Sequence, residues 1–167
     1  MTRVPSLDVS VVFGANEEHI DACLASLEDA RADPALTVRV TVFANDPGSS
    51  HADAIAARHP WARLVRNPHV RGFAENHNDV LRSSEADYVL VLNDDVVLRP
   101  GAVRACVEFL ERPENASVAS LSPRLLDPDG SLQRSTYAFP TVPRAWLSVT
   151  GLRGVVPSVG SRTRPLG

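Results

Sequence analysis

The sequence predicts an α/β domain built on a mostly parallel sheet flanked by helices. Three observations support this fold class: strand-like runs alternate with segments of helical periodicity, their spacing suits successive strand–helix units, and Tyr88–Leu92 is apolar throughout. A continuous apolar strand is typical of a parallel sheet, whose strands are buried on both faces. The 167 residues are enough for one such domain with a substantial hydrophobic core.

The first half of the chain contains two strand–helix units. Leu7–Phe13 is rich in β-branched residues and predicts a buried strand, after which Asn16 can cap a helix. Apolar residues at i, i+3, i+4 and i+7 within 20–27 give that helix one apolar stripe. Thr37–Ala44 predicts the second strand because it ends in a cluster of turn-forming residues, and 52–56 predicts a short helix.

The second half continues the alternation around the apolar run at 88–92. Trp61–Arg66 predicts a short third strand, and Gly72 precedes a helix with apolar residues at helical spacing. A further helix is expected over 100–112, because it starts with Pro-Gly and carries an apolar stripe. Val118–Leu121 predicts another strand, and 125–135 predicts a hairpin around the turn sequence Asp-Pro-Asp-Gly.

Composition and charge exclude several classes of function. The net charge of −3 gives no basic surface for nucleic acid, so a nucleic-acid partner is not expected. No apolar run is long enough to span a membrane and the first residues lack a signal-peptide pattern, which predicts a cytoplasmic location. A dinucleotide-dependent oxidoreductase is the least favoured enzyme class, because Gly14 belongs to no G-x-G-x-x-G loop.

Polar residues follow three of the predicted strands at the point where each strand ends. They are Asn16-Glu17, Asn45-Asp46 and Asn93-Asp94-Asp95. In an open α/β sheet the ligand binds outside the carboxyl ends of the strands. Because parallel strands share that edge, we expect these side chains to converge there from distant parts of the sequence.

The segment Asn93-Asp94-Asp95 is the most informative of the three. Adjacent carboxylates at a rigid strand end repel each other, and a hard divalent cation such as Mg²⁺ or Mn²⁺ would relieve that repulsion. A cation that also bridged a diphosphate would stabilise the charge on a departing nucleotide. The alternative is an acidic turn that is only solvated.

Several short motifs in consistent order resemble the family 2 glycosyltransferases, especially their rhamnosyltransferase-like branch, from about Asp8 to Ala138. The matching stretches are Val9–Val12 with Asn16-Glu17, Cys23–Leu27, Arg66-Asn67 with Gly72-Phe73-Ala74 and Asn78, Tyr88–Asp95 with Arg99-Pro100-Gly101, and Pro123–Leu126 with Asp129-Gly130. The resemblance implies a Rossmann-like GT-A fold and an enzyme that transfers sugar, with inversion, from a UDP- or dTDP-sugar.

The resemblance also implies roles for particular residues. Asp95 would contact the metal as the last residue of a D-x-D-like motif, with Asn93 in the first position and Asp94 in the middle. Residues that would contact or border the donor nucleotide are Asn16, Glu17, Asn45, Asp46, Arg66, Asn67, Gly72 and Asp94. The sequence departs from the family at Ala44, where many members have an aspartate that contacts the base or ribose, and Asp46 is the candidate replacement.

The end of the chain lacks the family's acidic acceptor-side motif, in which one carboxylate deprotonates the acceptor hydroxyl. We therefore expect a nucleotide-sugar-binding domain over 1–140, the truncated start of an acceptor-side region over 141–167, and no catalytic base in this chain. Two functions stay open: the donor-binding half of a transferase, and a non-catalytic nucleotide-sugar-binding or interaction module.

The expected partners follow from these two functions. They are a nucleoside diphosphate sugar, a divalent cation, and a glycan or lipid-linked acceptor. Two further hypotheses are peripheral association with the inner face of the membrane and self-association through a sheet edge left open by truncation.

Overall fold

The computed structural model describes residues 3–14, 19–48, 50–133 and 135. The chain forms two compact units, 1–121 and 122–167. All helices and named strands of the described residues belong to the first unit. The domain boundary expected at residue 140 lies outside the described residues.

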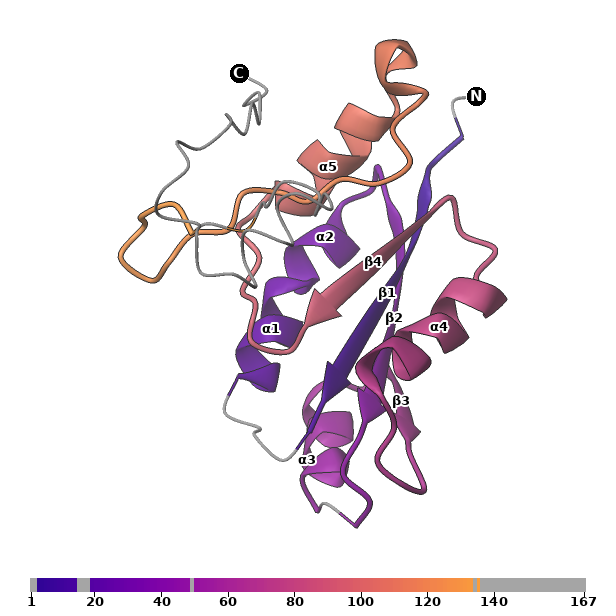
Figure 1. Ribbon diagram of the computed structural model, residues 1–167, viewed down its shortest axis with the longest axis vertical. Coiled ribbons are helices and arrows are strands. Elements are labelled where there is room, and N and C mark those ends of the chain that lie inside the picture. The colour runs from indigo at the N-terminus through magenta and orange to yellow at the C-terminus, as the bar shows by residue number, and fades with distance from the viewer. Residues whose placement is uncertain (1–2, 15–18, 49, 134, 136–167) are drawn as a thin grey trace, which may run out of the picture. The chain divides into compact units, whose positions relative to one another are not determined.

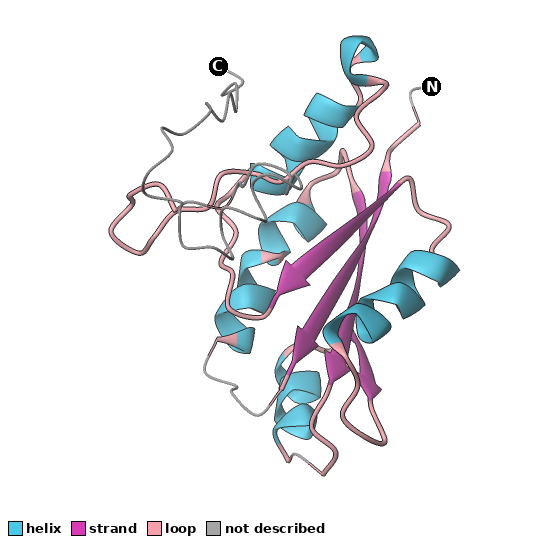
Figure 2. Ribbon diagram, viewed as in Figure 1, coloured by secondary structure: helices cyan, strands magenta, loops and turns pink. Residues whose placement is uncertain are grey.

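The first unit is built around a four-stranded, all-parallel sheet (Figures 1 and 2). Its strands are β1 (Ser6–Phe13), β2 (Thr37–Ala44), β3 (Arg63–Arg66) and β4 (Tyr88–Asn93). Their order across the sheet is β3-β2-β1-β4, with Val9 of β1 opposite Val40 of β2 and Leu90 of β4. This arrangement confirms the predicted α/β fold with a parallel sheet.

Helices cover both faces of the sheet. They are α1 (Ile20–Ser26), α2 (Glu28–Ala32), α3 (His51–Arg58), α4 (Phe73–Ser83) and α5 (Ala102–Leu110), followed by a 3₁₀ turn at Pro113–Asn115. In Figure 1, α1, α2 and α5 lie on one side of the sheet and α4 lies on the other. The first predicted helix is divided into α1 and α2, because the Leu27 N–H bonds to Leu24 O at 3.0 Å in a tighter turn.

The main hydrophobic core lies on the side of the sheet covered by α1 and α5. Alternate residues of β1, including Val9 and Val11, pack with Leu24 and Leu27 of the α1 segment, and all four are fully buried. Ile55 of α3 joins the same cluster. The register places residues of β2 and β4 beside those of β1, so these three strands form one continuous apolar face.

Polar groups hold much of the opposite face, against which α4 packs. Asp8 of β1 accepts hydrogen bonds from Arg39 Nε at 2.7 Å and from the Ser84 hydroxyl at 2.6 Å. The hydrogen bond from Arg39 is the largest cause that lowers the pKa of Asp8 below its ordinary value. Farther along β1, Ser10 Oγ and His77 Nδ1 of α4 share a buried hydrogen bond of 2.8 Å. The seating of α4 therefore depends on specific hydrogen bonds as well as apolar contact.

His77 makes the stability of the fold sensitive to pH. Burial lowers the pKa of His77 below its ordinary value, and its Nε2 atom has no partner within the described part of the chain. The unfolded imidazole binds a proton near pH 6.5, so the unfolded state binds more protons just below that pH. We expect the thermal midpoint to fall as the pH drops below about 6.5, and to fall less in His77→Gln. Melting curves at successive pH values test this, and equal slopes in both proteins would contradict it.

Two predicted elements beyond α5 differ from the structure. Val118–Leu121 forms no strand, because its residues pair with no neighbouring strand and the Val118 N–H bonds back to Asn115 O at 2.8 Å. The predicted hairpin at 125–135 is reduced to one antiparallel bridge between Leu126 and Leu132. Its turn does form, with Gly130 at φ +85°.

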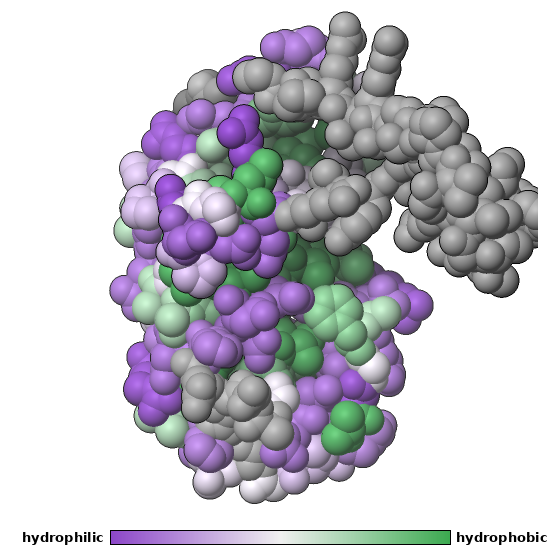
Figure 3. Space-filling view, turned by 60° about the vertical axis from the view of Figure 1, so that its left-hand side comes forward, coloured by the Kyte–Doolittle hydropathy of each residue, from purple (hydrophilic) through white to green (hydrophobic). Residues whose placement is uncertain are grey.

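Exposed hydrophobic side chains are scattered over the described surface. The larger ones are Val4, Val70, Phe73, Leu81, Val91, Val97, Leu126 and Leu132. On the face shown in Figure 3, hydrophobic residues occupy separate areas among polar ones. Single exposed apolar residues are normal on folded proteins and by themselves indicate no binding surface. Within the described residues, no helix has the length and apolar character that a membrane crossing requires.

Candidate functional site

The four strands end at one edge of the sheet, where the sequence places its polar groups. The ladder continues one residue beyond two strands: the Asn45 N–H donates to Phe13 O at 2.9 Å, and the Asn67 N–H donates to Ala44 O at 3.0 Å. These bonds fix the backbone where β2 and β3 end. The predicted nucleotide contacts Asn16 and Glu17 lie outside the described residues.

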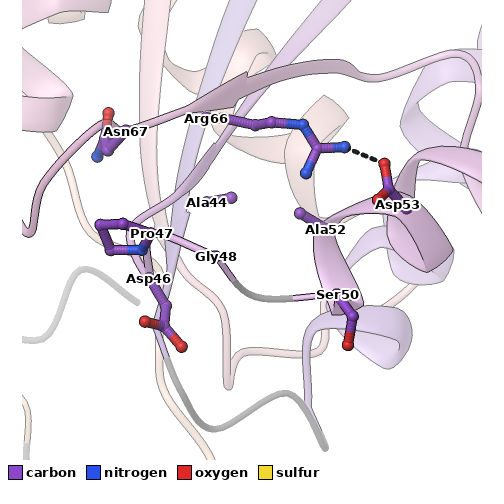
Figure 4. A pocket seen from close by; sticks show the side chains of 9 residues that line it. All are labelled: Ala44, Asp46, Pro47, Gly48, Ser50, Ala52, Asp53, Arg66 and Asn67. Carbon is purple, nitrogen blue, oxygen red and sulfur yellow. Dashed lines mark hydrogen bonds and ion pairs between the residues drawn. The ribbon is translucent and has the colours of Figure 1, made fainter.

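A pocket opens where β2 and β3 end and α3 begins (Figure 4). Its volume of about 390 Å³ is within the range of small-ligand sites. The residues that line it are Ala44, Asp46, Pro47, Gly48, Ser50, Ala52, Asp53, Arg66 and Asn67. Three of the predicted nucleotide-contacting residues, Asp46, Arg66 and Asn67, therefore share one pocket.

Charged side chains of both signs line this pocket. Arg66 Nη2 forms an ion pair with Asp53 of α3, and Figure 4 shows the guanidinium turned toward that carboxylate. The Asp46 carboxylate lies apart from this pair in the same view. Gly48 has φ +89°, a left-handed conformation that favours glycine and turns the chain back toward α3. A neutral heterocycle with both donors and acceptors suits such a lining.

Asn45 and Asn67, predicted to border the nucleotide, have their amides engaged within the protein. Asn45 Oδ1 accepts the Arg71 N–H at 2.9 Å, and Asn45 Nδ2 donates to Arg71 O at 2.9 Å. Asn67 Nδ2 donates to Asn45 Oδ1 at 2.8 Å and to Asn76 Oδ1 at 2.6 Å. Sequence reasoning missed Asn76, because a sequence does not show which groups a side-chain amide bonds.

Gly72 stands at the start of α4 and does not line the pocket. Its φ of −64° is open to any residue, and an added Cβ would meet only Glu75 Cβ at 4.0 Å. The Gly72 N–H donates to Glu75 Oε2 at 3.4 Å. The backbone of Gly72 is thus accessible, and its contact with a nucleotide stays a prediction.

The acidic turn Asn93-Asp94-Asp95 begins at the last residue of β4, at the same end of the sheet. Asn93 and Asp95 are exposed, whereas Asp94 is half-buried. Burial raises the pKa of Asp94, and the Asp95 charge raises it further. The described residues contain no cluster of three or more His, Cys, Asp or Glu side chains placed to hold a metal. The turn offers two carboxylates and one side-chain amide.

Helix α1 anchors this turn and the loop after it. Cys23 Sγ donates a weak hydrogen bond to Asn93 O at 3.4 Å, and burial with the nearby Asp94 and Asp95 charges raises the pKa of Cys23 to about 12. The Ser26 hydroxyl accepts the Leu98 N–H at 3.0 Å. Side chains of α1 thus hold the backbone of the acidic turn and of the loop after it. The apolar periodicity of this helix did not reveal that role.

The amino-acid sequence over 9–148 matches the family described as glycosyl transferase family 2, which is most of the chain. The chain belongs to this family. No curated protein matches it.

Solved structures support the GT-A fold of this family 2 glycosyltransferase chain. A mannosyltransferase, PcManGT from Pyrobaculum calidifontis in complex with GDP-Man and Mn²⁺, is 24% identical with a TM-score of 0.53, over 67% of this chain and 34% of its own. S. aureus TarS residues 1–349 are 16% identical with a TM-score of 0.55, over 64% and 32%. The chain thus spans about a third of the length of these structures.

The acidic turn of this glycosyltransferase chain is chemically suited to a hard divalent cation. Carboxylate and amide oxygens are the donors that Mg²⁺ and Mn²⁺ prefer, and such ions usually take their remaining ligands from phosphate and water. Burial is the main cause that raises the pKa of Asp94, and the adjacent Asp95 charge adds to it. A cation beside them would stabilise the ionised form of both.

Proposed function

We propose that this chain binds the donor of an inverting glycosyltransferase, a nucleoside diphosphate sugar of the UDP or dTDP type. One observation carries the proposal: the pocket at the ends of β2 and β3 and the acidic turn after β4 lie at one sheet edge. A nucleotide and its diphosphate need two such neighbouring regions of different chemistry.

The pocket is the proposed site of the base and ribose. Uracil and thymine present one N–H donor between two carbonyl acceptors. Asp46 would accept from the N–H or from ribose hydroxyls, and Arg66 would donate to a carbonyl oxygen. Asp53 holds the Arg66 guanidinium at the pocket wall, which limits the entropy lost when a ligand binds.

The acidic turn is the proposed site of the diphosphate and its cation. Asp95 would contact the ion, Asn93 would support it through its side-chain oxygen, and Asp94 would contribute charge beside the nucleotide. A cation held there would supply positive charge that stabilises the departing nucleoside diphosphate. The protein residues hold this charge in place through a turn anchored by α1.

The acceptor is proposed to be a glycan or a lipid-linked sugar, within the rhamnosyltransferase-like branch that the sequence motifs resemble. None of the described residues is proposed as the base that deprotonates its hydroxyl. A second candidate function is a non-catalytic nucleotide-sugar-binding or interaction module. Ala44 favours it, because the aspartate expected at the end of β2 is replaced by a buried alanine.

Calorimetric titration of the purified chain with UDP, dTDP and GDP, each with and without Mn²⁺, tests the proposed function. GDP is included because the PcManGT structure contains GDP-Man. We expect Mn²⁺-dependent binding of UDP or dTDP, weakened about tenfold in Arg66→Ala through loss of one charged hydrogen bond. No binding of any nucleotide by a folded chain would contradict the proposal. Binding without sugar transfer to any acceptor would favour the non-catalytic module.

Self-association and peripheral membrane association remain proposals. Among the described residues β4 pairs only with β1, so its other edge has unpaired N–H and C=O groups that could meet a second copy. Size-exclusion chromatography with light scattering tests this, and a monomer at all concentrations would exclude it. Co-sedimentation with anionic vesicles tests membrane association at the cytoplasmic face, and no co-sedimentation would exclude it.

A further inference from the structure

Asn76 is a fully buried polar residue that does not line the pocket. It is nevertheless linked by hydrogen bonds to the ends of β2 and β3, where the pocket lies. It lies in the second turn of α4 with 0% of its surface exposed. Its Oδ1 accepts from Asn67 Nδ2 at 2.6 Å, and its Nδ2 donates to Gly72 O at 3.0 Å. Both polar atoms of the side chain are therefore satisfied inside the protein.

The bond to Asn67 extends the connection to the ends of two strands. Asn67 is 4% exposed and uses its amide to bond both Asn76 and Asn45. Asn67 directly follows Arg66, and Asn45 directly precedes Asp46. The three amides, hereafter the asparagine network, thus fix the backbone next to each of the two charged pocket residues proposed to recognise the base.

The asparagine network also holds the loop between β3 and α4. Asn45 bonds both main-chain groups of Arg71, in the manner of a neighbouring strand. Arg71 itself is clamped by Glu75 and Asp79 of α4, with Nε–Oε1 and Nη1–Oδ2 distances of 2.9 and 2.7 Å. The first turns of α4 and the ends of β2 and β3 are therefore one connected hydrogen-bonded assembly.

We propose that Asn76 is a positioning residue of the donor pocket, which acts through Asn67 and Asn45 to set the separation of Arg66 and Asp46. The proposal rests on the proposed function. It differs from a purely structural role because misplacement of binding groups by a fraction of an ångström lowers affinity without unfolding the protein. Asn76 would thus control donor affinity from α4, without contacting the donor.

Asn76→Asp separates the positioning role from a purely structural role, because the hydrogen bonds of the new side chain depend on pH. The substituted side chain has the same shape, but when ionised it cannot donate to Gly72 O, and burial raises its pKa. When protonated it can donate to Gly72 O and accept from Asn67. We expect nucleotide affinity about tenfold below wild type near pH 8, and within about twofold of wild type near pH 6, each compared at the same pH.

Val80→Ala is the matched control, because Val80 is a buried apolar residue on the same helix. It should lower the melting temperature and leave the affinity within about twofold of wild type. Asn76→Ser is the second variant in case the ionised variant does not fold. Its hydroxyl can bond Gly72 O but cannot reach Asn67, so we expect weaker binding at both pH values.

The outcomes distinguish this proposal from the proposed function. If wild type binds no nucleotide, both are wrong. If wild type binds and the folded Asn76 variants bind equally well, or Val80→Ala loses as much affinity, only the positioning role is wrong. Hydrogen exchange at the Arg71 amide gives a readout without ligand: we expect it about tenfold faster in Asn76→Ser and unchanged in Val80→Ala.

Discussion

Asp95→Ala should abolish Mn²⁺-dependent nucleotide binding and leave the fold intact. Asp95 is exposed and no hydrogen bond to its side chain exists within the described residues, so its removal costs the folded chain little. In the proposed site it is the carboxylate that contacts the cation. Its loss removes the carboxylate proposed to contact the cation, and we expect affinity to fall at least about a hundredfold.

Calorimetry of this variant beside Glu108→Ala checks the prediction. Glu108 is an exposed carboxylate of α5 that pairs with Arg104, so its removal also takes one negative charge from the surface. Binding should survive in Glu108→Ala and disappear in Asp95→Ala, with circular dichroism unchanged in both. Equal weakening in the two variants would indicate a general charge effect and would remove Asp95 from the site.

Leu24→Ala should cause a large loss of stability. Leu24 is fully buried between α1 and the apolar face of the sheet, in the same cluster as Val9 and Val11. Removing it loses transfer free energy and leaves a cavity, so we expect the free energy of unfolding to fall by about 2–5 kcal/mol. Because α1 also anchors the acidic turn, metal affinity should fall as well.

Urea denaturation of Leu24→Ala and Leu81→Ala measures this difference. Leu81 lies on α4 with about half of its surface exposed, so the same chemical change there should cost less than about 1 kcal/mol. Equal losses at the two positions would show that α1 is not packed as described.

The strands of the sheet could be predicted because their residues satisfy a local rule. Thr37–Ala44 was predicted with the bounds that the structure gives, since its β-branched run ends at strong turn formers. Val118–Leu121 was predicted as a strand from a short apolar run, but it pairs with no strand of the described residues, and a strand requires a partner that composition does not supply. The break at Leu27 was also missed, because the apolar stripe continues across it.

The part of the site that could be predicted is the set of polar residues at strand ends, together with the residues that the family resemblance implies. Parallel topology places Asp46 at this end of the sheet, the family resemblance implies Arg66, and both residues line the pocket. The asparagine network could not be predicted, because Asn45 and Asn76 stand 31 positions apart and an amide in a sequence has no visible partner. The support of the acidic turn by Ser26 was hidden for the same reason, with Leu98 72 positions away.

The most direct test of the central claim is an NMR titration of the ¹⁵N-labelled chain with UDP or dTDP and then Mn²⁺. The nucleotide should shift the amides of Asp46, Gly48 and Arg66. Paramagnetic Mn²⁺, added with nucleotide, should broaden Asp94 and Asp95 first and broaden Glu75 and Asp79 of α4 less. Broadening centred on Glu75 and Asp79, or no change at the strand ends, would contradict a donor site at this sheet edge.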